Sequence, residues 1–116
     1  MKAAPQLSML WESADPEQAL SQRFGFPDAV SVVGWMGDVL GGAWAIAVDD
    51  CDRLIISGGN LLAWITADGR RLIAKWSVVP ELFQRLADTT ALTMWLHHSG
   101  IPVAAPVPAS DGRLRV

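Results

Sequence analysis

The sequence predicts an α+β domain in which an antiparallel β-sheet carries one main helix on one face, with a short helix before the strands. Three observations predict this class: a tight-turn dipeptide at Asp68-Gly69, a long periodic helix over about residues 80–98, and helix-start signals near residue 16. The chain has 116 residues, 51% hydrophobic and 18% charged, so we expect one small folded domain spanning residues 1–116.

In the first third of the chain we expect one helix and two β segments. Asp15 can cap a helix that has Pro16 at its first position, and Gly25 can end it, which predicts a helix over roughly residues 16–24. The runs "AVSVVGWM" and "AWAIAVDD" that follow are read as β segments, separated by the glycine-rich "GDVLGG".

The central part predicts an antiparallel meander of three strands, near residues 53–57, 61–67 and 70–76. Asp68-Gly69 readily takes the positive backbone angles of a two-residue hairpin, and "SGGN" joins the first two strands.

Pro80 opens the clearest helix in the chain, and Gly100 ends it. Apolar residues and threonines recur along it at spacings of three and four, so we expect the helix to pack on the sheet through that stripe. The stripe consists of Leu82, Leu86, Thr89, Thr93 and Leu96. Beyond the helix, the turn "ASDGR" predicts a further hairpin near residues 103–116.

Charge and cysteine content limit the partners and the compartment. The net charge of -3 lacks a basic footprint, so nucleic acid and anionic membranes are not expected as partners. The single Cys51, the absence of a signal-peptide pattern and the lack of a long apolar run predict a soluble, cytoplasmic protein. Cys51 has no spaced ligand partner and His97 adjoins His98, so we expect no metal site.

The order of motifs resembles a known family. The succession "SGGNLLAWITADGRRLIAKWS", then a helix, then "WLHHSGIPVAAPVPASDGRLRV" is similar to the N-terminal lobe of the aminoglycoside phosphotransferase and choline kinase-like family, small-molecule kinases with the protein-kinase-like fold. The resemblance covers residues 51–116 well and residues 1–50 loosely. It implies an ATP-binding lobe, and the ordered set of motifs is its most specific element.

The resemblance implies a role for Lys75, which matches the strand lysine that holds the α- and β-phosphates of ATP. A compact ammonium suits that position better than the wide fork of arginine, and the only other lysine in the chain is Lys2. The alternative is a strand lysine that points to solvent.

The glycine loop and its flanks complete the implied nucleotide site. Gly58 and Gly59, followed by Asn60, match the loop whose backbone N–H groups approach phosphate oxygens. Ile73 and either Leu62 or Leu61 match the apolar contacts to adenine. An ordinary hairpin turn and ordinary core packing are the alternatives for these residues.

Two departures from the family pattern concern catalysis. Thr89 stands where the family has the helix glutamate that pairs with the lysine, and Glu81 could reach Lys75 or simply favour the helix dipole. The chain has no "HGD" motif, so catalytic residues, the Mg²⁺ ligands and the site for the small-molecule acceptor are expected in a second lobe that this chain lacks.

Three hypotheses follow. The chain is the ATP-binding N-lobe of a longer phosphotransferase that acts on a small hydroxyl-bearing molecule and is inactive alone. Alternatively, it is a stand-alone binding or dimerisation module, with a homo-oligomer formed through exposed apolar surface. The third hypothesis is an unrelated α+β domain.

Overall fold

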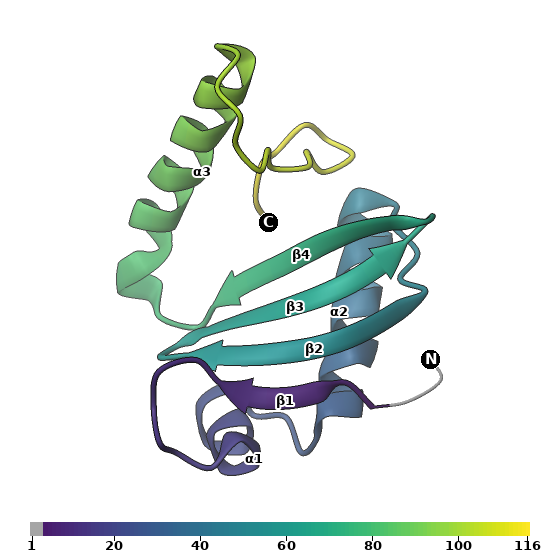
Figure 1. Ribbon diagram of the computed structural model, residues 1–116, viewed down its shortest axis with the longest axis vertical. Helices are drawn as coiled ribbons and strands as arrows, with labels where there is room; N and C mark the ends of the chain where they lie inside the picture. Colours follow the sequence, from purple (N-terminus) through teal and green to yellow (C-terminus); the bar gives the residue numbers. More distant parts are fainter. Residues whose placement is uncertain (1–3) are drawn as a thin grey trace.

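The structure is a computed structural model that describes residues 4–116. Within these residues the chain forms an α+β domain with an open, mixed, four-stranded sheet in the order β1-β2-β3-β4 (Figure 1). The strands are β1 (Gln6–Met9), β2 (Asp50–Ser57), β3 (Asn60–Ala67) and β4 (Arg70–Ser77). β1 pairs parallel to β2, whereas the other neighbouring strands are antiparallel.

The predicted meander of three antiparallel strands is confirmed, and both of its turns contain two residues. Asp68 and Gly69 have φ angles of 51° and 72°, the two positive angles that a type I′ turn requires. At the other turn, Gly58 alone has a positive φ of 60°. Each turn closes its hairpin directly, since Ala67 pairs with Arg70 and Ser57 pairs with Asn60.

The helix predicted over residues 16–24 is confirmed. It consists of α1 (Pro16–Ala19) and a π-helical turn (Leu20–Phe24). The Asp15 carboxylate accepts a hydrogen bond from the Gln18 backbone N–H at 3.2 Å, and Gly25 ends the helix with a φ of 76°.

The β segments expected at residues 29–36 and 43–50 are wrong. α2 (Ala29–Trp44) takes the whole of the first segment, and the second contains the end of α2, an irregular stretch over residues 45–49 and only the first residue of β2. Asp28 caps the helix by accepting hydrogen bonds from the backbone N–H and the hydroxyl of Ser31, at 2.8 and 2.7 Å. Val32 and Met36 lie four residues apart on the buried face. Burial of this face offsets the low helix propensity of the valines and glycines.

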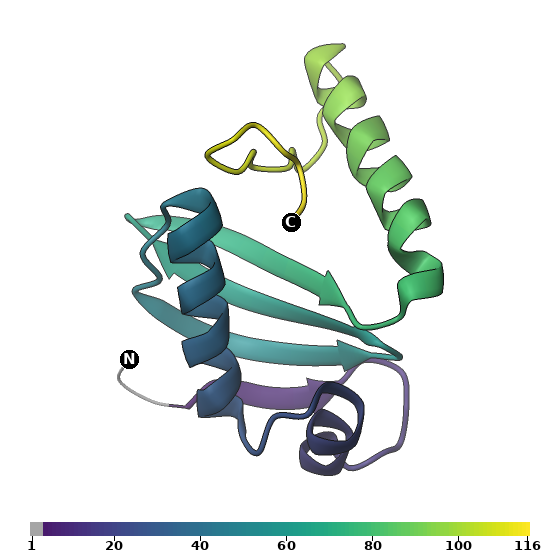
Figure 2. The same ribbon diagram turned by 180° about the vertical axis from the view of Figure 1, so that it is seen from behind.

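The hydrophobic core lies between α2 and one face of the sheet. Figures 1 and 2 show that α1 and α2 lie on the same side of the sheet. Fully buried side chains from both layers meet there, and they include Leu20, Val32, Met36, Leu54, Ile56 and Leu61. The opposite face of the sheet is therefore covered by neither α1 nor α2.

α3 (Phe83–His98) follows a 3₁₀ turn (Pro80–Leu82), so the predicted limits of the helix are confirmed. Its predicted packing on the sheet is wrong, because no residue of α3 is buried and the helix projects away from the sheet (Figure 1). The core face of the sheet packs against α2 and the helix before it, and no residue of α3 belongs to that core.

The hairpin predicted near residues 103–116 does not form as paired strands. The expected turn is present, with the Gly112 N–H donating to the Ala109 carbonyl at 2.9 Å. Three prolines in residues 101–108 remove the backbone donors that a strand would need. The segment instead contacts the end of α2, where the Trp44 indole N–H donates to the Val107 carbonyl and the Ser110 N–H to the Ala43 carbonyl, each at 2.8 Å.

Candidate functional site

The candidate site is the face of the sheet that points away from α2, which we call the open face. Successive residues of β3 alternate between the two faces. Leu61, Ala63, Ile65 and Ala67 are buried toward α2, so the intervening residues lie on the open face. These are Asn60, Leu62, Trp64 and Thr66, all half-buried.

Three of the residues implied in nucleotide binding share this face. Lys75 lies directly opposite Leu62 in the register of β3 and β4, and Ile73 lies opposite Trp64. Because directly opposed residues point to the same side of a sheet, the side chains of Leu62, Ile73 and Lys75 form one surface. Leu61 is fully buried against α2, so of the two leucines Leu62 is the one available to a ligand.

The exposed fraction of Ile73 and the exposure of Lys75 bear on the alternatives of core packing and a solvent-facing lysine. Ile73 is 56% exposed, so it is not a core residue. Lys75 is exposed as well, and it takes part in no ion pair among residues 4–116. The open face therefore presents an apolar side chain and an ammonium group two residues apart on an edge strand.

Other positive charges flank this surface. The Arg53 guanidinium lies over the Trp64 ring, 5.6 Å from its centroid, in cation–π geometry. Arg71 lies opposite Thr66 on the same face and forms an ion pair with Asp52 at 2.7 Å. The open face is thus apolar and cationic at once, which suits a ligand that has a flat ring and a negative charge.

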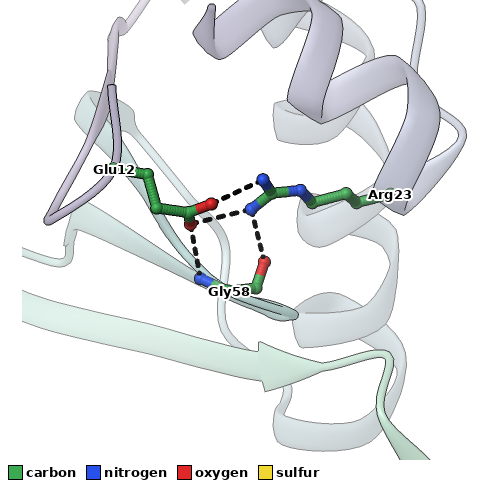
Figure 3. Close-up of polar contacts among 3 residues, drawn as sticks. All are labelled: Glu12, Arg23 and Gly58. Atoms are coloured by element: carbon green, nitrogen blue, oxygen red, sulfur yellow. Dashed lines mark hydrogen bonds and ion pairs between the residues drawn. The ribbon is translucent and has the colours of Figure 1, made fainter. Parts of the chain in front are cut away.

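The glycine turn beside this surface is held by a pair of side chains that no sequence pattern predicts. Glu12, in the loop after β1, forms a bidentate ion pair with Arg23 of the π-helical turn, at 2.6 and 2.9 Å (Figure 3). The Glu12 carboxylate also accepts from the Gly58 N–H at 3.1 Å, and Arg23 donates to the Gly58 carbonyl at 3.0 Å. We call Glu12, Arg23 and Gly58 the turn clamp.

The turn clamp shifts the ionisation of both side chains. The hydrogen bond from Arg23, and secondly the one from the Gly58 N–H, lower the pKa of Glu12 from 4.5 to about 2. The same hydrogen bond, which Arg23 donates to the Glu12 carboxylate, raises the pKa of Arg23. Both groups are therefore charged throughout the neutral pH range, and the Gly58 N–H is already donated to a carboxylate.

Gly59 and Asn60 have different surroundings. A Cβ at Gly59 would collide with the side chain of Val79, so close packing explains why this position holds glycine. The Gly59 carbonyl accepts from the Val78 N–H at 3.0 Å. The Asn60 side-chain oxygen is buried and has no hydrogen-bond partner among residues 4–116. It is an unused acceptor at the turn end of the open face.

Among the described residues, Glu81 forms no ion pair with Lys75. Thr89 has no charge with which to replace the glutamate that the family pairs with the lysine. The Thr89 hydroxyl donates to the Arg85 carbonyl at 2.9 Å within its own helix. Its expected inward position is wrong, because Thr89 is exposed. Glu81 is also exposed, in the 3₁₀ turn before α3, where its charge favours the helix start.

Within residues 4–116, no group of three or more His, Cys, Asp or Glu side chains could hold a metal ion. No helix in this part of the chain is long and apolar enough to cross a membrane. Cys51 is a free, buried cysteine, and burial raises the pKa of its thiol.

Comparison with known proteins found no match to the chain, whether among family models, curated proteins or solved structures.

Proposed function

We propose that the chain is the ATP-binding lobe of a phosphotransferase that phosphorylates a small hydroxyl-bearing molecule, such as an aminoglycoside. The observation that carries the proposal is the common placement of Leu62, Ile73 and Lys75 on the open face. The strand order around it supports the same reading: a glycine turn, a tight hairpin, the lysine strand and then a helix follow one another from β2 to α3.

The adenine ring and the phosphates of ATP each have a matching feature on this face. Leu62 and Ile73 offer apolar surface to the adenine ring, and the Lys75 ammonium offers a point charge to phosphate oxygens. Ser57, Asn60 and Ser77 lie in one row across the sheet, which places the glycine turn two residues from Lys75 along β4. A nucleotide that lies along β3 and β4 would have its phosphates at the turn end.

The remaining chemistry of phosphoryl transfer has to come from elsewhere. The reaction requires an aspartate that accepts the proton of the attacking hydroxyl, and carboxylate or amide oxygens that hold Mg²⁺. The chain has no "HGD" motif, and the described carboxylates form no metal-binding group. We propose that a second unit supplies these residues and binds the acceptor, and that the chain alone transfers no phosphoryl group.

The test is a nuclear magnetic resonance titration of the ¹⁵N-labelled chain with Mg-ATP, and separately with adenosine. We expect a dissociation constant near about 1 mM or weaker, because an open face encloses only one side of the ligand. Amide shifts should concentrate at residues 61–64 and 72–76. Shifts confined to other parts of the chain would contradict the proposal, and micromolar affinity would contradict the idea of half a site.

The exposed apolar surface of α3 supports a second candidate function, a binding or dimerisation module. Phe83, Leu92 and Trp95 are 42%, 55% and 63% exposed on a helix that buries no residue. Leu92 and Trp95 are three residues apart and share one side of α3, and exposed apolar side chains on one side of a helix are typical of protein–protein contact surfaces. A second copy of the chain is the proposed partner.

A further inference from the structure

The turn clamp brings together three parts of the chain that are far apart in sequence. Glu12 lies in the loop after β1, Arg23 in the helical turn after α1, and Gly58 between β2 and β3 (Figure 3). Because α1 lies on the α2 side of the sheet, Arg23 reaches the turn from the side opposite to the open face (Figures 1 and 2).

The donors of the turn clamp are those that bind phosphate in proteins. A guanidinium group offers two parallel N–H donors to a planar or tetrahedral anion, and a glycine N–H in a turn offers a third. Here both N–H groups of the Arg23 fork and the Gly58 N–H are directed at one carboxylate, at distances from 2.6 to 3.1 Å. Glu12 thus occupies the centre of an anion-binding arrangement.

The carboxylate can be displaced without disturbing the core. The side chains of Arg23 and Glu12 are 32% and 36% exposed, so solvent and small anions reach the pair. The neighbouring Trp11 is 81% exposed and does not anchor the loop. Exposed ion pairs are weak and are screened by salt, so a dissolved anion of higher charge can compete with Glu12.

We propose that Arg23 and the Gly58 N–H form a phosphate-binding site in which Glu12 acts as an internal competitor. In the resting chain the carboxylate fills the site. A phosphate group takes its place by accepting the same hydrogen bonds, and the loop that carries Glu12 moves away. The inference goes beyond the proposed function, because Arg23 reaches the turn from the side opposite to the open face and the site is separate from the one proposed for the nucleotide. Inorganic phosphate and the phosphates of a free nucleotide offer this site the same chemistry.

The test measures phosphate binding at the Gly58 amide by ¹H–¹⁵N spectra. Inorganic phosphate, Mg-ATP and adenosine are titrated into the wild type, Glu12→Ala and Glu12→Gln. We expect both variants to bind inorganic phosphate about fivefold or more tightly than the wild type, with Glu12→Ala ahead, because the amide of glutamine still fills part of the site. Adenosine should leave the Gly58 amide unshifted.

Two controls identify the site. Arg23→Gln added to Glu12→Ala should abolish the gain. Asp111→Asn removes the carboxylate of another exposed ion pair, the one between Asp111 and Arg113 at 2.6 Å, and should leave phosphate affinity unchanged. If Asp111→Asn raises the affinity as much as Glu12→Ala does, the gain reflects net charge and the proposal is overturned.

The outcomes separate this inference from the proposed function. If phosphate affinity is unchanged in folded Glu12→Gln and Glu12→Ala, the inference is wrong whatever ATP does. Tighter phosphate binding in these variants, combined with no ATP shifts on the open face, would keep the phosphate site and refute the nucleotide-binding lobe. Should Glu12→Ala fail to fold, the Glu12→Gln result decides alone, because the amide keeps the hydrogen bond from Gly58.

Discussion

Leu62 and Lys75 lie directly opposite each other on β3 and β4, on the open face of the sheet. Their sequence neighbours Leu61 and Ala74 point to the other side, toward α2. A shift of register by one residue would turn Lys75 into the core. The two-residue turn at Asp68-Gly69 prevents that shift, so a local turn determines the side on which the ammonium lies.

We expect Lys75→Ala to weaken binding of Mg-ATP about fivefold or more. The reason is that the Lys75 ammonium is the group that we propose contacts the phosphates. Lys75→Arg should also bind more weakly, since the guanidinium has a different shape. The melting temperature should hardly change, as Lys75 is exposed. Chemical-shift titration and calorimetry measure the two quantities.

Lys2→Ala is the matched control, because it removes the only other lysine of the chain. Equal loss of affinity in both variants would indicate a nonspecific effect of charge. Unchanged affinity in Lys75→Ala together with a lower melting temperature would show that Lys75 is structural, and the nucleotide role of the strand would be wrong.

Gly59→Ala should lower the free energy of unfolding by about 1–3 kcal/mol, because the new methyl group collides with Val79. Gly34→Ala is the control. Gly34 lies in α2 with open space around its Cα, so alanine should raise the free energy of unfolding by about 0.5–1 kcal/mol through helix propensity. Urea unfolding measures both. Equal values for the two variants would refute close packing as the reason for Gly59.

Sequence patterns predicted the elements that depend on neighbouring residues. The alternation in "LLAWITA" and the turn at Asp68-Gly69 specify β3, β4 and their register. In the same way, Asp15 and Gly25 specify both ends of the first helix. The face on which Leu62, Ile73 and Lys75 meet follows from this register, so this part of the candidate site could be predicted.

Features that depend on the whole fold were missed. The valines of residues 29–36 favoured a strand, but the spacing of Val32 and Met36 against the sheet determines a helix. β1 pairs in parallel with a strand more than 40 residues away, which no local turn signals. Glu12 and Arg23 are 11 residues apart, and only the packing of α1 brings them to the glycine turn.

The apolar surface of α3 yields a prediction about self-association. We expect the chain to form a concentration-dependent dimer, and Trp95→Arg to weaken it about tenfold or more, because buried tryptophans dominate the energy of interfaces. Trp11→Arg is the matched control, since Trp11 is 81% exposed and lies outside α3. Sedimentation velocity measures the association. A wild type that stays monomeric at high concentration, or equal effects of both variants, would contradict the second candidate function.

The ionisation of Glu12 predicts how stability depends on pH. Its pKa falls from 4.5 in the unfolded chain to about 2 in the folded protein, so the folded state binds its proton less readily. The turn clamp therefore stabilises the fold fully above about pH 4.5. This contribution disappears as the pH falls from there toward 2, where the folded protein also becomes protonated.

Glu12→Gln removes this titration while it keeps a hydrogen-bond acceptor for the Gly58 N–H. We expect the wild type to be more stable than Glu12→Gln at pH 7, and the difference to shrink steadily between about pH 4.5 and 2. Asp28 and Asp111 also have lowered pKa values, so both proteins lose stability in acid, and the difference between them isolates Glu12. Urea unfolding at a series of pH values provides the measurement. A difference that stays constant down to pH 2 would mean that Glu12 has an ordinary pKa and that the turn clamp does not form in solution. In that case Glu12 would not occupy the proposed phosphate site, and the proposed competition between phosphate and Glu12 would be wrong.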